Sequence, residues 1–526
     1  MLSPWWNATT SAWVKIAIAG AALAVVVWAE WARRARNPAE RALWDRRRGK
    51  LLGALGVLAT LAYFNFGSFH FDGIYVHLWD TAHYALGAKY FDELGYDGLY
   101  ECIAVADAEV PGEAPHVARR EIVDLRTNRL TTAAQVVAHP ERCKARFSPQ
   151  RWAVFSADVS LFRARFPTPD WERFPTDHGF NASPVWILVA HPLVGNAPMT
   201  WSRIELLTAI DPLIVVGSLL AVVGAFGGWT GSIVAVVFGT YFPGRLWWTG
   251  GSFLRWDWLA ALLAGLALCR RKRPFAAGVL LGYSALVRVF PVFALVGIVL
   301  AGATAMLRRR PLDPAAVRVL VGALAVTMVL GPLAGAVRRD HAWTDFAHNL
   351  RKHSSVASAN RMGLAVTLAF DRHSRQAALH PDGGDDRRGR WEDAQAETLR
   401  GRRWIWIALA ALGTLAIALA VRDQPVWAAG VLGLLLVPVA TPIACYYYAF
   451  MAALPLLTER KSEAGGITLA LALAAGLVAR LPRYEMDEQY AAQSLLALVA
   501  FVFLASAFIS RRRPAEPGGM QSCDSP

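Results

Sequence analysis

The chain has 526 residues, of which 55% are hydrophobic, and carries a formal net charge of +14. Its mean hydropathy of +0.32, with the apolar residues gathered in long runs, excludes an ordinary soluble protein. The charge does not indicate nucleic-acid binding, because the cations cluster in short loops between apolar runs, as on the cytoplasmic side of a membrane protein. Since lipid offers the backbone no hydrogen-bond partner, we predict an all-α polytopic membrane protein.

Two apolar runs open the chain, at residues 12–31 and 51–68. The connector 32–50 between them is rich in arginine, so residues 1–68 are predicted to form a two-helix segment with a cytoplasmic connector and an external N-terminus. The first run is long and arginines follow it, which indicates a retained span rather than a cleavable signal peptide.

Residues 69–203 form a long polar segment that we predict to be an extracytoplasmic loop. It opens with Asp72, His77, Asp80 and His83 close together at a membrane edge. Apolar residues then recur at spacings of three and four, which predicts a short helix on the membrane surface. Asp80 at its start could take a proton from a hydroxyl, or it could serve only as an N-cap.

The end of this loop, residues 174–195, is apolar but contains breakers, so a re-entrant or interfacial segment is predicted rather than a span. Asp177 and His178 precede the apolar part and are candidates for a catalytic or sugar-binding role, or for loop structure. Cys102 and Cys143 lie in the same loop. They could form a disulfide outside the cytoplasm, and two free thiols are the alternative. Cysteine and histidine spacings suggest no metal site.

Residues 204–337 are predicted to form a central transmembrane bundle, with spans near 204–224, 229–243, 254–269, 274–288, 290–307 and 315–337. Arg288 lies in an apolar stretch at an outer turn. Its fork-shaped side chain would fit a phosphate, or it could snorkel to lipid headgroups. Asp211 lies inside a span, where a carboxylate is a functional candidate, or pairs structurally at the kink of Pro212.

Residues 338–402 are predicted to be a second extracytoplasmic loop, in which His348 and Asn360 could bind a sugar or anionic group, or lie on a solvated surface. Residues 403–510 should form a C-terminal transmembrane bundle, and 511–526 a disordered tail. Tyr446 and Tyr447 start a late span. They could stack on a sugar or prenyl chain, or belong to an interfacial aromatic belt. The whole chain is expected to contain roughly thirteen transmembrane helices.

Five short motifs follow one another in the chain: WDTAHYALGAKYFDELGYDGLY, FNASPVWILVAHPLVG, RRKRPFAAGVLLGYSALVRVFP, HNLRKHSSVASAN and TPIACYYYAF. In this order they resemble the GT-C superfamily of membrane glycosyltransferases, and in particular bacterial alpha-mannosyltransferases that use polyprenyl-phosphate mannose. The resemblance covers roughly residues 70–455. The chain departs from it in having Arg288 where lysine is commoner, and in the turn WTGGSFLRW, which lacks a glycine–glutamine pair.

The resemblance implies an enzyme of the bacterial inner membrane that moves a sugar from a polyprenyl-phosphate donor to a lipid or glycan acceptor. It implies Asp80 as the base and Arg288 as a ligand of the donor phosphate, and we expect no cofactor. Two other classes stay open. A transporter would place ionisable groups near the middle of the membrane and contain paired repeats. A non-catalytic membrane scaffold would not need His77, Asp80, Arg288 and His348 to converge.

Overall fold

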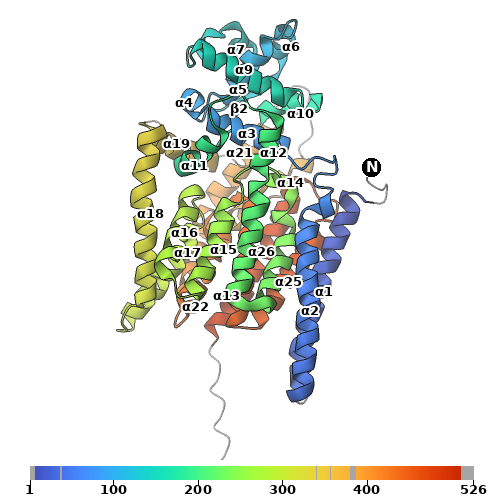
Figure 1. Ribbon diagram of the computed structural model, residues 1–526, viewed down its shortest axis with the longest axis vertical. Helices are drawn as coiled ribbons and strands as arrows, with labels where there is room; N and C mark the ends of the chain where they lie inside the picture. The colour runs from blue at the N-terminus through green and yellow to red at the C-terminus, as the bar shows by residue number, and fades with distance from the viewer. Residues whose placement is uncertain (1–5, 36–37, 339, 356, 379–386, 511–526) are drawn as a thin grey trace, which may run out of the picture.

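The computed structural model describes residues 6–35, 38–338, 340–355, 357–378 and 387–510. These residues are mostly helical and contain two small antiparallel sheets. Figure 1 shows a tall bundle of helices that carries a head of short helices at one end. The prediction of a predominantly helical protein is confirmed in this coarse form. The predicted tail, 511–526, lies outside the described residues.

The N-terminal hairpin consists of α1 (Ala8–Ala35) and α2 (Pro38–Tyr63) at one side of the bundle. Residues 38–50 of the predicted basic connector belong to α2, so that part is helical. Its place on the cytoplasmic side stays a prediction. Arg48 is buried, lies 4.9 Å from the ring centre of Trp28 and donates to the carbonyl of Ala29 at 3.3 Å. The two helices extend beyond the rest of the bundle at the end away from the head (Figure 1).

The head is built from the first long loop. Its elements are η1 (Asn65–Gly67), α3 (Leu78–Lys89), α4 (Phe91–Leu94), α5 (Leu99–Ala108), α6 (Ala114–Arg119), β1 (Glu121–Asp124), β2 (Arg129–Thr132), α7 (Ala134–Ala138), α8 (Glu141–Lys144), α9 (Pro149–Arg163), α10 (Thr168–Arg173) and η2 (Phe174–Thr176). β1 pairs with β2 in antiparallel register, with Glu121 opposite Thr132. A disulfide joins Cys102 of α5 to Cys143 of α8. Of the two predicted alternatives, the structure therefore contains the disulfide and not two free thiols.

The proline-broken segment forms a single short helix, α11 (Pro184–Val194), which Ser183 caps by accepting from the backbone N–H of Trp186. The helix packs against α3, α16 and α18 beneath the head. Eleven residues are too few to cross a bilayer as an α-helix. α12 (Trp201–Thr208) then leads the chain back into the bundle.

The long helix α13 (Ile210–Thr240) is in fact two arms that reverse at Gly227. Gly227 has φ +82°, and a side chain on Gly231 would collide with Val223, so the arms fold closely back on each other. The first arm starts at Asp211, next to Arg255 near the head. It ends at Gly224, whose carbonyl accepts from Arg271 in the turn after α15. One unbroken helix from 201 to 240 would be roughly 60 Å long, about twice the thickness of the hydrocarbon core of a bilayer.

After α13 the chain makes a short aromatic turn and returns to the bundle. The turn contains η3 (Phe242–Gly244) and α14 (Leu246–Thr249). The bundle helices that follow are α15 (Asp257–Arg270), α16 (Pro274–Val287), α17 (Val292–Leu307) and α18 (Pro314–Arg338). Arg308 and Arg310 lie in the turn between α17 and α18, at the end opposite the head, and both bind Asp423. Figure 1 shows α18 on the side opposite α1 and α2.

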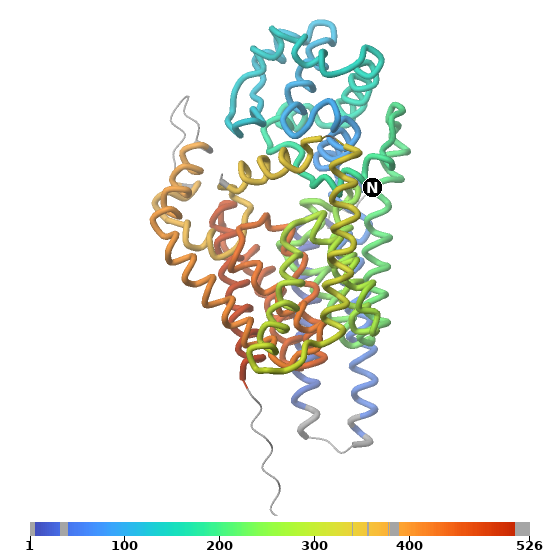
Figure 2. Tube along the Cα trace, turned by 90° about the vertical axis from the view of Figure 1, so that its left-hand side faces the viewer, coloured from blue at the N-terminus to red at the C-terminus, as the bar shows by residue number. Residues whose placement is uncertain are grey.

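The second long loop lies at the same end of the bundle as the head. Its elements are α19 (Ala342–Ser355), β3 (Arg361–Met362), α20 (Leu364–Ala369), η4 (Gln376–Ala378) and α21 (Arg387–Gly401). Figure 2 shows α19 crossing beneath the head. Lys352 of α19 donates to the carbonyl of Leu125, and Arg338 lies 3.5 Å from the carboxylate of Asp92, so the two loops are joined by polar contacts.

The C-terminal bundle consists of α22 (Arg403–Ala420), α23 (Val426–Leu434), α24 (Val437–Ala440), β4 (Ile443–Ala444), η5 (Cys445–Glu459), α25 (Glu463–Val478) and α26 (Met486–Ile509). β4 pairs with β3, which ties the start of η5 to the second loop. η5 is an almost entirely buried 3₁₀ helix of 15 residues, whereas most such helices are one turn long.

Five apolar helical segments are long enough to cross a membrane by length and composition: Ala8–Trp31, Trp201–Thr240, Pro314–Arg338, Arg403–Ala420 and Met486–Ile509. Shorter apolar helices lie among them. The protein is therefore a helical membrane protein. The number of spans, the division into six segments and the side on which the head lies stay predictions.

Candidate active site

The start of α3 is held against the aromatic turn that precedes α15. His77 is the N-cap residue, and its Nδ1 accepts from the backbone N–H of Asp80 at 3.0 Å. The ring Nε2 of His77 lies 3.0 Å from the carbonyl of Trp247, and its backbone N–H donates to Gly251 at 2.8 Å. The alternative in which Asp80 is only the N-cap is therefore wrong: Asp80 lies in the first turn, and its carboxylate is available for other contacts.

Asp80 forms a buried ion pair with Arg255, a residue that the sequence analysis did not select. The Nε of Arg255 lies 2.7 Å from Oδ2 of Asp80, with the two side chains 2% and 14% exposed. The N–H does not point at the carboxylate, so both atoms keep unused hydrogen-bonding capacity among the described residues. The guanidinium also lies 3.8 Å from the ring centre of Tyr84. Arg255 is thus fixed by charge and by stacking, not by a full set of hydrogen bonds.

Asp211 has a structural role at this site. Its Oδ2 accepts from the backbone N–H of Arg255 at 2.8 Å, and the residue is buried. In the same turn, any side chain on Gly251 would meet the carbonyl of Tyr75 at 1.9 Å, so the backbone comes close there because the residue is glycine. Asp211 and Gly251 together hold the turn in the shape that directs Arg255 towards α3.

Arg288 approaches the same ring of Tyr84 from the end of α16. It is 6% exposed, and its guanidinium lies 5.7 Å from the ring centre of Tyr84 and 5.9 Å from that of Trp186. Nη1 donates to the carbonyl of Val287 at 2.9 Å. Nε and Nη2 are buried and have no hydrogen-bond partner among the described residues. A buried cation with unused N–H groups is costly unless a ligand completes its contacts.

Aromatic side chains from the start of η5 close the site. Tyr446 lies 5.7 Å from the guanidinium of Arg255, and its ring packs against Tyr447 at 4.5 Å between centres. Tyr447 also packs against Phe290 at 5.3 Å, just after Arg288. The predicted residues Asp80, Arg288, Tyr446 and Tyr447 therefore share one neighbourhood.

Three carboxylates lie near the two arginines. Asp211 accepts from the backbone N–H of Arg255, and Asp257 accepts from the hydroxyl of Tyr283 at 3.0 Å. Asp80 lies at ion-pair distance from Arg255, and N–H groups of both arginines have no hydrogen-bond partner among the described residues. Such an arrangement suits an anion that binds beside the carboxylate.

His83 and Asp177 form a second layer behind Asp80. His83 bonds the hydroxyl of Tyr100 at 2.6 Å and stacks on Phe174 at 4.2 Å, while Asp177 accepts from the indole N–H of Trp79 at 2.8 Å. Burial acts to raise the pKa of Asp177, but His83, His178 and the Trp79 hydrogen bond together bring that pKa below its usual value. Asp177 is therefore a fixed negative charge that orients this layer.

From the second loop, the residue that reaches this layer is His353, not His348. The rings of His178 and His353 lie 5.7 Å apart, whereas His348 is exposed on α19. Burial, together with His178 and Lys352, lowers the pKa of His353 to about 2, so its ring is neutral at ordinary pH. It can donate or accept a hydrogen bond but cannot hold an anion by charge.

The other two predicted residues lie apart from the arginines. Asp72 is exposed, and its carboxylate accepts from the backbone N–H of Ile74 at 2.9 Å. Asn360 accepts from the hydroxyl of Ser358 at 2.8 Å, and its carbonyl accepts from the backbone N–H of Cys445 at 2.8 Å. Asn360 thus fixes the second loop to the start of η5 and contributes to the site through the backbone.

Two hollows in the described surface lie elsewhere. One, of about 80 Å³, lies between α20 and α21, and the other, of about 530 Å³, opens in the head around Arg151 and Arg338. Neither is lined by Asp80, Arg255 or Arg288. The described residues contain no group of three or more histidine, cysteine or acidic side chains that could hold a metal ion.

The fold and this cluster define a helical membrane protein with a buried polar site, built around Asp80, Arg255 and Arg288, at the head end of its bundle. No protein-family model, curated protein or solved structure matches the chain. The functional assignment therefore depends on the chemistry of the site. The sequence contained one signal for the missed Arg255: it is one of two cations, with Arg245, in the otherwise uncharged stretch 241–256 between two apolar helices.

Proposed function

We propose that this protein is a GT-C-type glycosyltransferase that transfers a sugar from a polyprenyl-phosphate donor to a lipid or glycan acceptor on the extracytoplasmic face. The observation that carries the proposal is the convergence of Asp80, Arg255 and Arg288 around Tyr84, with buried guanidinium N–H groups unused. This site offers a base for a hydroxyl and two cations for a phosphate, which are the two requirements of such a transfer.

In the proposed reaction an acceptor hydroxyl attacks the anomeric carbon of the donor sugar. The new carbon–oxygen bond forms as the bond between that carbon and the donor phosphate breaks. The phosphate leaves with the bonding electrons, and Arg255 and Arg288 stabilise its growing charge. The hydroxyl proton passes to Asp80. We assume a single displacement with inversion.

The environment of Asp80 suits a base. Burial raises its pKa above the usual value for an aspartate, while Arg255, His83 and Arg288 limit the rise. A higher pKa makes the carboxylate a stronger proton acceptor. Tyr446 and Tyr447 present ring faces on which a sugar or the first prenyl unit could stack.

The placement of the site supports an extracytoplasmic reaction. The head contains the Cys102–Cys143 disulfide, and disulfides persist in oxidising compartments. The arginine-rich turn after α17 lies at the other end of the bundle, as expected for a cytoplasmic side. For a bacterial inner-membrane protein the donor would then reach the site from the outer leaflet.

The test is transfer by purified protein. Wild-type protein is incubated with radiolabelled polyprenyl-phosphate sugars and a lipid extract of cell envelopes, beside Asp80→Asn and the matched exposed variant Asp72→Asn. We expect a labelled product from wild type and Asp72→Asn, and none above background from Asp80→Asn. Transport of intact donor into the lumen of proteoliposomes without product formation would favour a transporter. Absence of both activities with every donor would favour a scaffold.

A further inference from the structure

A second cluster of cations lies beside the N-terminal hairpin, outside the proposed active site. Lys15 comes from α1, Arg245 from the residue between η3 and α14, and Arg480 from the turn after α25. The helix α25 packs against both α1 and η3, and Arg480 donates to the start of α1, so the three segments meet in one place. There the charges of the two arginines act on Lys15, and that of Arg245 acts on Arg480. Three segments far apart in the sequence therefore place positive charge in one small region.

The contacts of these cations are all with neutral groups. Lys15 donates to the side-chain oxygen of Asn65 at 2.7 Å, and Arg480 donates to the carbonyl of Ala8 at 3.2 Å. Arg245 lies 4.1 Å from the ring centre of Phe242. Within the described part of the chain, no carboxylate comes within ion-pair distance of any of the three. The Nε atoms of Arg245 and Arg480 are buried and have no hydrogen-bond partner there.

This arrangement is unfavourable without an anion. Burial and the neighbouring Arg245 lower the pKa of Arg480 below its usual value, which expresses the cost of the accumulated charge. The arginine pair at the other end of the bundle differs, because Arg308 and Arg310 share the carboxylate of Asp423. The N-terminal cluster thus lacks a counter-charge that the protein supplies elsewhere.

The depth of the cluster suits a lipid headgroup. Lys15 lies about two turns, or roughly 10 Å, along α1 from Ala8, near the outer end of an apolar helix. α1 packs directly on α25, where a side chain on Gly476 would contact Ile16. Trp13 and Leu481 flank the cluster in sequence and are 43% and 67% exposed. Such apolar surface beside half-buried cations favours a phosphate that carries acyl chains over a free ion.

We propose that Lys15, Arg245 and Arg480 form a binding site for the phosphate group of an anionic membrane phospholipid. Its acyl chains lie along the outer surface of α1 and α25. The site is separate from the proposed active site, because Trp248 lies between them. The guanidinium of Arg245 lies 5.8 Å from the ring centre of Trp248, and that ring also packs on Tyr446, at 6.5 Å, which in turn faces Arg255. The proposal does not depend on transferase activity.

The experiment is lipid retention by the detergent-purified full-length protein, measured by native mass spectrometry. Phosphatidylglycerol, phosphatidylcholine and inorganic phosphate are added in separate titrations. The variants are Lys15→Met, Arg480→Gln and Arg480→Lys. The matched control is Arg483→Gln, which removes the same charge from an exposed position in the same turn. Unchanged elution as a single species and an unchanged thermal midpoint identify variants that are folded.

We expect wild type, Arg480→Lys and Arg483→Gln to retain phosphatidylglycerol, and Arg480→Gln and folded Lys15→Met to lose at least tenfold in apparent affinity. If Lys15→Met does not fold, Arg480→Gln and Arg480→Lys still decide the question. Equal retention by Arg480→Gln and Arg483→Gln would overturn the site. Equal binding of phosphatidylcholine would remove its charge selectivity. Displacement of the lipid by an equal concentration of inorganic phosphate would show a site for a free anion instead.

Discussion

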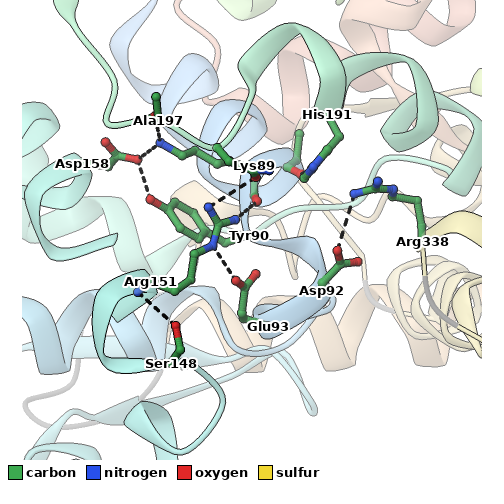
Figure 3. A network of polar contacts seen from close by, with 12 residues as sticks. Lys89, Tyr90, Asp92, Glu93, Ser148, Arg151, Asp158, His191, Ala197 and Arg338 are labelled. Atoms are coloured by element: carbon green, nitrogen blue, oxygen red, sulfur yellow. Dashed lines mark hydrogen bonds and ion pairs between the residues drawn. The ribbon is translucent and has the colours of Figure 1, made fainter. Parts of the chain in front are cut away.

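The two ends of α3 carry buried charges that are arranged in opposite ways. At the C-terminal end, Lys89 donates to Asp158 and to the carbonyl of Ala197, both at 2.6 Å, and Tyr90 donates to the same carboxylate at 2.6 Å (Figure 3). At the N-terminal end, two arginines face Asp80, and several of their N–H groups have no partner among the described residues.

The difference separates structural charges from candidate functional ones. The Lys89 network also includes Arg151, which pairs with Glu93 at 2.6 Å, so the network locks α3 and α4 to α9 (Figure 3). Lys89, Tyr90 and Arg151 all donate to carboxylate or carbonyl groups of the protein itself. Burial of a charge is therefore a poor marker of function by itself, whereas burial with unused hydrogen-bonding capacity is a better one.

The largest expected effect is on stability and concerns the C-terminal end of α3, where Lys89 is paired with Asp158. Lys89→Met keeps the length of the side chain but leaves the carboxylate of Asp158 buried and without its cation. Removing one partner of a buried pair costs about 3–5 kcal/mol. The apparent thermal midpoint in detergent should fall strongly. Lys144→Met is the control, because that lysine is 43% exposed and its pair with Glu109 contributes little. If Lys89→Met kept normal stability but abolished transfer, the role of Lys89 would be functional and not structural.

The next largest effect is on turnover and concerns the N-terminal end of α3, where Asp80 lies. Asp80→Asn keeps the size of the side chain and removes the proton acceptor, so kcat should fall roughly 100-fold or more while the donor still binds. Single-turnover transfer and equilibrium binding of labelled donor measure the two quantities separately. Near-normal turnover would place the base at another carboxylate.

A smaller effect is expected on donor affinity. Arg288→Ala removes a guanidinium that we assign to the donor phosphate, and a hydrogen bond to a charged group contributes about 1.5–3 kcal/mol. The donor Kd should therefore rise by roughly one to two orders of magnitude. Arg273→Ala at the exposed start of the same helix is the matched control and should leave the Kd unchanged. Loss of turnover with unchanged affinity would contradict the assigned role.

The smallest effect is a shift of the pH profile. Asp80 acts only when deprotonated, so kcat should rise with pH and level off above the pKa of its carboxyl group. Because burial raises this pKa, the midpoint should lie above the usual aspartate range. Arg255 is the main cation that opposes the rise. Arg255→Gln should therefore move the midpoint to higher pH, and a shift to lower pH would contradict the electrostatic account.

The sequence predicts the helical membrane class well, because long apolar runs have few alternatives to a helix in lipid. It predicts less well where tertiary packing decides. Residues 38–50 look like a basic connector, but they form the first half of α2, and Arg48 among them stacks on Trp28. His348 and His353 are indistinguishable in the sequence, and only the orientation of α19 buries the second.

The candidate site shows the same limit. Asp80, Arg288 and the tyrosines were marked by charge or by aromatic runs in apolar surroundings. Arg255 was not, because its importance comes from a turn that Asp211 and Gly251 hold in place. Contacts between residues so far apart in the chain leave no local periodicity from which they could be predicted.

The 3₁₀ form of η5 determines how far its first residues reach. Fifteen residues rise roughly 30 Å at 2.0 Å each, whereas an α-helix of that length would rise about 22 Å. η5 uses this reach to connect Tyr446 beside Arg255 with Glu459, which binds Thr230 at 2.6 Å and Arg270 at 3.2 Å. The length of η5 therefore sets the distance between Tyr446 and Glu459. Removing a single residue would shorten it by about 2 Å and turn the tyrosines by roughly a third of a rotation away from the arginines.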